Sequence, residues 1–424
     1  MRFLLSFLIT LSIACGVLSL PSGSKSQLKG RSFKVERVRR GNEPVHGPTA
    51  LRRAYEKFGI VPTDLGIDLD DFEPIMTKHA VVEKKDVTEP DQKGAVSASS
   101  VLGDAAFVSP VIIGGQKVVL NFDTGSIRWF WSLTLPAEAQ KGRTVYNPSN
   151  SSTFKKMEGA TFNISYGDAS YAYGGVGTDT VNVGGAIVKD QAIGIPDTVS
   201  SAFIEDTTSN GLVGLGFSSL NTVKPKQQKT FFDNIADSLQ EPVMTASLKA
   251  NGVGEYEFGI LDHDKYQGDI ANVSVDSSKG FWQFELAKFA VADGDIQTIK
   301  ENPTAIADTG TSLMLLSQEV VDAYYAKIEG AIYASSASGY IYPCNASLPS
   351  ISVAIGSNHL ATVPGNLINF SEVGINKTTG GKVCFGGVQS NQGSSMQILG
   401  DVFLKAFFVV FDLRGPSLGV ASPK

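Results

Sequence analysis

The chain is poor in the residues on which metal and thiol chemistry depend. Its 424 residues include only 3 Cys and 4 His, and no His-Glu-x-x-His sequence occurs. Zinc hydrolases hold their metal through clustered side chains of these types. We therefore expect no metal and no cofactor.

Net positive charge is lacking as well. The formal net charge is −6. Because phosphate backbones are bound through an excess of Lys and Arg, this balance argues against nucleic acid as a partner. Beyond residue 20 no apolar run approaches the ~20 residues that span a bilayer, so we expect no membrane partner for the body of the chain.

One apolar run does occur, at the N-terminus. Arg2 precedes a stretch from Phe3 to Leu20 that is almost wholly apolar, and Val17-Leu18-Ser19 offers a small-residue cleavage site. This arrangement is typical of a secretory signal peptide. A membrane anchor is the competing interpretation, but the run is short and Pro21 follows it. We predict that residues 1–19 are removed and that the protein is secreted to the extracellular space.

Export would leave two cysteines. Cys15 lies in the removable segment, and in an oxidising compartment Cys344 and Cys384 are expected to form one disulfide. Two unpaired buried thiols are the alternative. Six N-x-S/T triplets favour a glycoprotein, although such triplets also arise by chance. They begin at Asn150, Asn163, Asn272, Asn345, Asn369 and Asn376.

A basic leader follows the signal segment. Residues 25–57 contain ten Lys or Arg against three Glu, and residues 1–94 carry a net charge of +3 whereas the remainder carries −9. Residues 87–100 are small and polar, as linkers are. A cationic leader on an acidic body favours a removable pro-segment, here residues 20–94, lying over an acidic cleft. An ordinary solvated basic tail is the alternative.

Beyond residue 94 the sequence patterns mostly predict strands. Apolar stretches flank Gly-containing turns at residues 110–120, 181–187 and 407–421, and residues 162–166 alternate in polarity. Two helices are predicted. One spans Phe231 to Leu239, and the other runs from Val320 to Ile328 with Ser317 as its N-cap.

Two short segments carry nearly the same sequence, Phe122-Asp123-Thr124-Gly125-Ser126 and Ala307-Asp308-Thr309-Gly310-Thr311-Ser312. The two Asp lie 185 residues apart, about one domain length, so a pseudo-two-fold axis could bring them together. Two close carboxylates cannot both ionise cheaply, so one keeps a proton while the other acts as a base. In each turn the Thr can lock onto its counterpart and the Gly permits a tight backbone. Ser126 or Thr311 can hydrogen-bond the carboxylate.

This doublet resembles that of the pepsin-like aspartic endopeptidases, and the similarity covers nearly all of residues 95–424. It is closest to the secreted fungal branch that includes penicillopepsin and aspergillopepsin. Residues 210–215 and 398–401 resemble the apolar-Gly segments that pass beneath each acid loop. The resemblance implies an all-β, bilobal fold with pseudo-two-fold lobes, a central cleft and few short helices. We place the N-terminal catalytic lobe with its flap at residues 95–262, and the C-terminal catalytic lobe at residues 263–424.

The resemblance also implies a reaction. Asp123 and Asp308 would be the catalytic residues, sharing one proton and holding the water that attacks a peptide bond of a polypeptide substrate, with an acidic pH optimum. Large apolar and Lys side chains would be preferred at the cleaved bond. The loops supporting the acids would comprise Thr124, Gly125, Ser126, Thr309, Gly310 and Thr311. The flap and substrate-binding residues would be Tyr166, Gly167, Asp168, Ser170 and Trp129.

Two stretches depart from the family pattern. Ala169 stands where a Gly is common in the flap, and residues 127–131 are one residue short. In that stretch Trp129 is expected to replace the Trp that hydrogen-bonds the flap tyrosine.

Family zymogens pair a pro-segment cation with the catalytic acids, so the pro-segment would be an intramolecular inhibitor. Lys57 is the candidate here, and the cut would fall near Lys93-Gly94 or at Lys84-Lys85. We expect a monomer.

Two other functions would account for part of this pattern. A glycosidase also uses two carboxylates, but it would not explain the mirrored Thr-Gly turns. A pepsin-like binding protein is the stronger rival, because fold alone does not fix function. Such members usually lose an acid or the flap tyrosine, whereas this chain retains Asp123, Asp308 and Tyr166.

Overall fold

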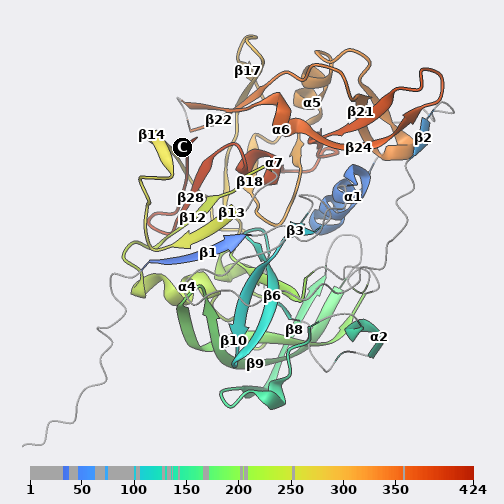
Figure 1. The fold of residues 1–424 in the computed structure, drawn as a ribbon. Coiled ribbons are helices and arrows are strands. Elements are labelled where there is room, and N and C mark those ends of the chain that lie inside the picture. Colours follow the sequence, from blue (N-terminus) through green and yellow to red (C-terminus); the bar gives the residue numbers. More distant parts are fainter. Residues whose placement is uncertain are drawn as a thin grey trace, which may run out of the picture.

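The computed structural model of the chain describes residues 32–37, 46–62, 72–74, 100–101, 106–126, 129–130, 135, 137–141, 144–165, 171–200, 204, 209–250, 254–356 and 359–424. These residues form β-sheets with a few short helices, and Figure 1 shows them in two halves above and below a central region. The predicted all-β, bilobal fold is therefore confirmed. The signal peptide, Cys15 and both predicted cleavage sites lie outside the described residues.

The half drawn in cyan and green is built on a seven-stranded sheet with the order β10-β9-β5-β6-β11-β7, in which β8 also pairs with β9 (Figure 1). The predicted hairpins at residues 110–120 and 181–187 are the β5–β6 and β9–β10 pairs. Apolar and polar residues alternate along β6, so Leu120 and Phe122 are buried while Lys117 is exposed. The strands are β5 (Ser109–Ile113), β6 (Gln116–Asp123), β7 (Trp129–Phe130), β8 (Lys155–Ser165), β9 (Tyr171–Val183), β10 (Ala186–Val199) and β11 (Gly211–Gly214). A small two-stranded sheet joins β3 (Ser100–Val101) and β4 (Ala106–Phe107).

A six-stranded sheet connects the two halves, because its strands come from both. Its order is β1-β13-β12-β28-β29-β14. The proposed lobe boundary at residues 262 and 263 therefore lies between β13 and β14, which belong to the same sheet. Its first strand, β1, comes from the basic leader and pairs antiparallel with β13. The predicted C-terminal hairpin is the β28–β29 pair. The strands are β1 (Phe33–Arg37), β12 (Val243–Ser247), β13 (Gly254–Phe258), β14 (Tyr266–Ser274), β28 (Phe408–Asp412) and β29 (Ser417–Pro423).

The half drawn in orange and red contains three further sheets (Figure 1). The first comprises β15 (Gln283–Glu285), β18 (Thr304–Ala307), β27 (Gln397–Leu399), β19 (Met314–Leu316) and β26 (Val388–Ser390). The second comprises β17 (Gln297–Thr298), β16 (Lys288–Val291), β22 (Ile351–Ile355) and β23 (His359–Val363). The third comprises β2 (Phe72–Pro74), β24 (Asn369–Asn376), β25 (Lys382–Gly386), β21 (Gly339–Pro343) and β20 (Ile332–Ala334). Its edge strand β2 is the second strand that the leader contributes.

Helices are few in the described ranges, and none is long and apolar enough to cross a membrane. The α-helices are α1 (Gly47–Phe58), α2 (Ala137–Gln140), α4 (Phe231–Ile235), α5 (Gln318–Tyr325), α6 (Gly365–Ile368) and α7 (Asp401–Leu404). The 3₁₀ helices are η2 (Pro148–Asn150), η3 (Ser218–Leu220), η4 (Ala236–Ser238) and η5 (Ser335–Ala337).

Both predicted helices exist, but each differs from its prediction. The first is α only to Ile235 and then continues as η4, where the Ser238 hydroxyl donates to the Ile235 carbonyl and competes with the helical backbone bond. Ser317 does occupy the N-cap position of α5, yet its hydroxyl makes no capping bond and, among the residues that the structure describes, is buried without a hydrogen-bond partner.

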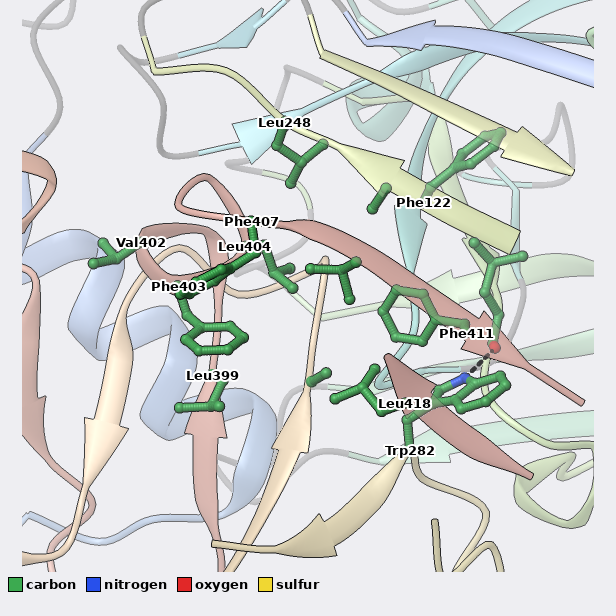
Figure 2. Close-up of a cluster of buried hydrophobic side chains, with 14 of the residues drawn as sticks. Phe122, Leu248, Trp282, Leu399, Val402, Phe403, Leu404, Phe407, Phe411 and Leu418 are labelled. Atoms are coloured by element: carbon green, nitrogen blue, oxygen red, sulfur yellow. Dashed lines mark hydrogen bonds between the residues drawn. The ribbon is translucent and has the colours of Figure 1, made fainter. Parts of the chain in front are cut away.

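A large apolar core lies beneath both acid turns. Phe122, directly before Asp123, is buried and stacks on Tyr256 with ring centroids 5.3 Å apart. Figure 2 shows Phe122 in one cluster with Trp282, Phe411 and Leu399, the last from the opposite half. The dashed line in Figure 2 is the Trp282 indole N–H donating to the Leu215 carbonyl at 3.0 Å. Burial of each such aromatic side chain stabilises the fold by about 2 kcal/mol. The acid turns are therefore supported by a well-packed core.

The predicted disulfide between Cys344 and Cys384 is present. Cys344 follows β21 and Cys384 lies in β25, and these two strands pair antiparallel. The bond closes a loop with a sequence separation of 40 residues.

We expect the double replacement Cys344→Ser, Cys384→Ser to lower the free energy of unfolding by about 4 kcal/mol. A loop of this length is more costly to order from an unconstrained unfolded chain. Denaturant titration of both proteins measures the difference. An unchanged unfolding midpoint would show that the β21–β25 pairing alone holds this region.

Candidate active site

The two acid turns occupy equivalent positions at the ends of two parallel strand pairs. Asp123 ends β6, which runs parallel to β11 with Asp123 opposite Gly214. Asp308 follows β18, which runs parallel to β27 with Ala307 opposite Leu399. The segments at residues 210–215 and 398–401 therefore do pass beside the two acid loops. This mirrored arrangement brings turns 185 residues apart in sequence into contact.

The threonines of the two turns lock them together through four hydrogen bonds. The Thr124 amide donates to the Thr309 hydroxyl at 3.1 Å, and the Thr309 amide donates to the Thr124 hydroxyl at 3.0 Å. Each hydroxyl then donates across the junction, Thr124 to the Ala307 carbonyl and Thr309 to the Phe122 carbonyl. Both threonines are buried, so these bonds are shielded from water and fix the relative position of the two acids.

The glycines are needed because each turn approaches the opposite acid closely. A Cβ on Gly310 would lie 2.4 Å from Asp123 Cγ, and one on Gly125 would lie 2.8 Å from Asp308 Oδ1. Neither glycine has a positive φ. The sequence predicted that these glycines permit a tight backbone. In the structure they leave room for the carboxylate of the opposite turn.

The two carboxylates share hydrogen-bond donors. The Gly125 amide donates to Asp123 Oδ1 at 2.9 Å and to Asp308 Oδ1 at 3.0 Å. Asp308 also accepts from the Gly310 amide and from the Thr311 hydroxyl. Asp123 is 5 % exposed and Asp308 is fully buried. The pair is therefore oriented by neutral donors in a site that largely excludes water.

A cation from the leader lies between the two acids. Lys57 Nζ donates to Asp123 Oδ1 at 2.8 Å and to Asp308 Oδ2 at 2.7 Å. Its side chain is only 12 % exposed. The sequence suggested Lys57 for this position, and the structure brings it within hydrogen-bonding distance of both carboxylates.

Electrostatics differ between the two acids. Burial raises the pKa of Asp123, and the neighbouring Asp308 adds to this, so that the value stays raised despite the opposing effect of Lys57. Burial also acts to raise the pKa of Asp308, but Lys57, Thr311 and the Gly310 amide outweigh it and lower the pKa. Burial opposes the charge of Lys57, yet the two carboxylates raise its pKa well above the usual value. The pair therefore holds its proton unequally, with Asp308 the more readily ionised.

Lys57 is positioned by helix α1, which the sequence reasoning missed. The helix lies between the two halves (Figure 1), and its Lys57 contacts both acids. Leu51 is buried and the Tyr55 hydroxyl donates to the Ser390 carbonyl at 2.8 Å. The signal was available in the sequence, because buried positions Ala50, Leu51, Ala54 and Tyr55 follow a helical spacing. Pro48 lies in the first turn of the helix, and Gly59, at φ 66°, caps its C-terminal end.

Other expected site residues are less fully described. Trp129 begins β7 and pairs antiparallel with Leu212 of β11. The flap residues Tyr166, Gly167, Asp168 and Ser170 lie outside the described residues, which include the hairpin strands β8 and β9 on either side of them. Within the described ranges no three His, Cys, Asp or Glu side chains gather as metal ligands would.

Two mirrored acid turns, cross-locked at the junction of two β-rich halves, define the pepsin-like class of aspartic peptidases. The model of the eukaryotic aspartyl protease family matches residues 106–423, and the chain belongs to this family. It is 68% identical over 429 residues to a putative aspergillopepsin A-like aspartic endopeptidase of Aspergillus fumigatus, covering 100% of both chains.

More distant relatives are also named as aspartic proteases. An aspartic protease of Coccidioides posadasii is 48% identical over 395 residues, covering 92% of this chain and 89% of its own. Aspergillopepsin-1 of Aspergillus oryzae is 42% identical over 412 residues, covering 95% of each chain. The chain is thus an aspartic endopeptidase of the aspergillopepsin group.

Proposed function

We propose that this chain is the precursor of a secreted acid endopeptidase in which Asp123 and Asp308 activate one water molecule. The observation that carries the proposal is the shared position within hydrogen-bonding distance of both carboxylates, where Lys57 Nζ lies at 2.8 and 2.7 Å. A water at that position would contact both acids at once.

The reaction follows from one shared proton. The ionised carboxylate takes a proton from the water as the water oxygen attacks the scissile carbonyl carbon. The protonated carboxylate donates to the carbonyl oxygen, giving a tetrahedral diol. Proton transfer to the amine nitrogen then lets the C–N bond break, and no acyl-enzyme forms. The Gly125 amide, which reaches both acids, keeps them aligned throughout.

We propose that residues 20–94 are an inhibitory pro-segment. Three contacts support this: β1 pairs with β13, β2 pairs with β24, and Lys57 occupies the space between the acids. Lys34 of β1 also forms an ion pair with Glu255, whose pKa is lowered: burial opposes this, but hydrogen bonds from Lys265 and Lys34 prevail. The leader therefore adds an edge strand to a sheet in each half. It also places a cation between the two acids.

The remaining assignments rest on the family resemblance. We propose that residues 1–19 direct secretion, that the lobes are residues 95–262 and 263–424, and that the enzyme is monomeric. The flap, with Tyr166 and Asp168, would close over a peptide and admit large apolar or Lys side chains beside the cleaved bond.

Acid proteolysis tests the proposed activity. Purified protein incubated at acidic pH should lose its leader and then digest denatured globin, and pepstatin, which inhibits pepsin-like enzymes, should stop the digestion. N-terminal sequencing during acid incubation locates the cut. Digestion that persists at saturating pepstatin would overturn the proposal.

His46 should make leader release sensitive to pH. It lies at the N-cap of α1, where its Nδ1 accepts from the Thr49 amide at 3.3 Å. Burial, and then the charge of Arg52, lower its pKa below 6.5, so the docked leader favours the neutral ring. Docking is therefore strongest above pH 6.5 and weakens as pH falls below it, because a protonated Nδ1 cannot accept.

We expect His46→Asn, which caps helices without titrating, to move the midpoint of leader release down by roughly 0.5 pH unit. Limited proteolysis of the leader across a pH series measures the midpoint. His359→Asn, at an exposed position in β23, is the control. An identical midpoint for His46→Asn and wild type would assign release to the carboxylates alone.

A further inference from the structure

One face of the hairpin that leads into the flap carries exposed aromatic residues. The register places Asn163 of β8 opposite Tyr173 of β9, with Ser165 opposite Tyr171 and Thr161 opposite Gly175. The alternate residues Phe162, Ile164 and Ala172 point the other way and join an apolar core. We call this side the tyrosine face, comprising Thr161, Asn163, Tyr171, Tyr173 and Gly175.

The two tyrosines form a flat platform. Tyr171 is 39% exposed and Tyr173 is 43% exposed, and their rings stack with centroids 5.8 Å apart and an interplanar angle of 20°. Beside them a Cβ on Gly175 would meet no heavy atom within 4 Å. The two exposed rings therefore lie beside open space above Gly175.

Asn163 lies within reach of this platform. Directly opposite residues on antiparallel strands have Cβ atoms about 5 Å apart. Asn163 begins the triplet Asn163-Ile164-Ser165, and its side chain is exposed. Within the described residues its amide makes no hydrogen bond.

Three of the other triplet asparagines make side-chain hydrogen bonds, among them Asn369, whose Oδ1 accepts from the Tyr342 hydroxyl. The Asn272 amide donates to the Ile270 carbonyl. Asn376 accepts from the amides of Thr378 and Thr379. Asn163 combines an amide that is unengaged among the described residues with an aromatic surface beside it.

We infer that Asn163 carries an N-linked glycan whose first sugar lies on the rings of Tyr173 and Tyr171. The amide nitrogen would attack the anomeric carbon of a polyprenyl-diphosphate-linked oligosaccharide. The new C–N bond forms as the C–O bond to the diphosphate breaks, and the amide gives up one proton. The apolar C–H face of the sugar then covers rings that otherwise face water. The inference rests on the proposed export, since that donor is met in the secretory pathway.

Site occupancy tests the first half of the inference. The precursor is expressed in a yeast secretory host behind that host's own signal peptide, which separates failure of the native signal from failure at Asn163. Release of glycans with peptide N-glycosidase F in ¹⁸O-water converts occupied Asn to labelled Asp, which mass spectrometry locates. We expect label at Asn163 and none in Ser165→Ala, which keeps the asparagine. An unlabelled wild-type Asn163 in secreted protein overturns the inference.

Native deglycosylation tests the second half. Sugars held on the platform should resist endoglycosidase H in the folded protein, and Tyr173→Ala should speed their release about 2- to 10-fold. Tyr173→Phe, which keeps the ring, should match wild type, and Asn150→Gln, at a different exposed triplet, should leave the rate at Asn163 unchanged. Equal release rates for Tyr173→Ala and Tyr173→Phe, both still folded by circular dichroism, would refute the packing.

Discussion

Replacing Asp123 with Asn is expected to reduce kcat/KM for peptide hydrolysis by about 10³- to 10⁴-fold. Asn has the same shape and keeps an oxygen that can accept from the Gly125 amide, which in the wild type lies 2.9 Å from Asp123 Oδ1. It cannot share a proton with Asp308. The pair then loses either its base or its acid, and Asp308→Asn should have an equally large effect.

The measurement has to separate chemistry from activation. Asp123→Asn also removes one partner of Lys57, and it stops any self-cleavage of the leader. The variant is therefore processed by a small amount of wild-type enzyme, which is then blocked or removed before assay. Asp295→Asn, at an exposed position, serves as the matched control, and thermal melting shows that each variant is folded. Near-normal turnover by processed Asp123→Asn would rule out the two-acid mechanism.

Replacing Lys57 with Gln is expected to give a precursor that is active near neutral pH before its leader is cut. Lys57 is a buried cation that contacts both acids. Loss of one partner of a buried ion pair costs about 3 kcal/mol or more, which corresponds to roughly a 100-fold weaker block. The initial rate of peptide hydrolysis by uncut precursor at about pH 6 measures it.

The pH dependence of this block has a definite sign. Lys57 lowers the pKa of Asp308, so the ion pair is complete above the ordinary Asp pKa and is lost as pH falls through the lowered value. Lys57→Gln removes that dependence. Arg53→Gln is the control, because among the described residues Lys57 forms ion pairs with both acids and Arg53, one turn earlier on the same helix, forms none with them. If uncut Lys57→Gln precursor hydrolyses peptide at pH 6 no faster than uncut wild type, the rest of the leader is sufficient to block the cleft without Lys57.

The acid turns could be predicted from the sequence because their chemistry is local and duplicated. Two copies of Asp-Thr-Gly imply a paired site, and the threonine hydroxyls lie where a mutual lock requires them. The reason for each glycine could not be obtained this way. It depends on the distance to a carboxylate in the other half of the molecule, which only the assembled fold determines.

Tertiary contacts also explain the errors at the helices. Ser317 has the right residue type for an N-cap, but packing buries its hydroxyl while its amide donates to Gln397. Helix α1 is hard to predict because it lies in a strongly basic stretch, where charge alone suggests a solvated tail, and only the spacing of Leu51 and Tyr55 indicates a helix. It docks against β24 and β25, and the bond from the Gly47 amide to the Ser371 hydroxyl joins residues 324 apart in sequence.

The covalent link through the chain between Lys57 and the two acids that it contacts would determine whether the proposed inhibition depends on enzyme concentration. While residues 74–100 remain intact, inhibitor and target are one molecule, so the local concentration of the ammonium is set by chain length and no dilution can lower it. A single cut in that stretch turns the same contact into a bimolecular equilibrium. After such a cut, under the proposed inhibition, we expect the leader to stay bound at high enzyme concentration and to dissociate on dilution, so that dilution would itself activate the enzyme.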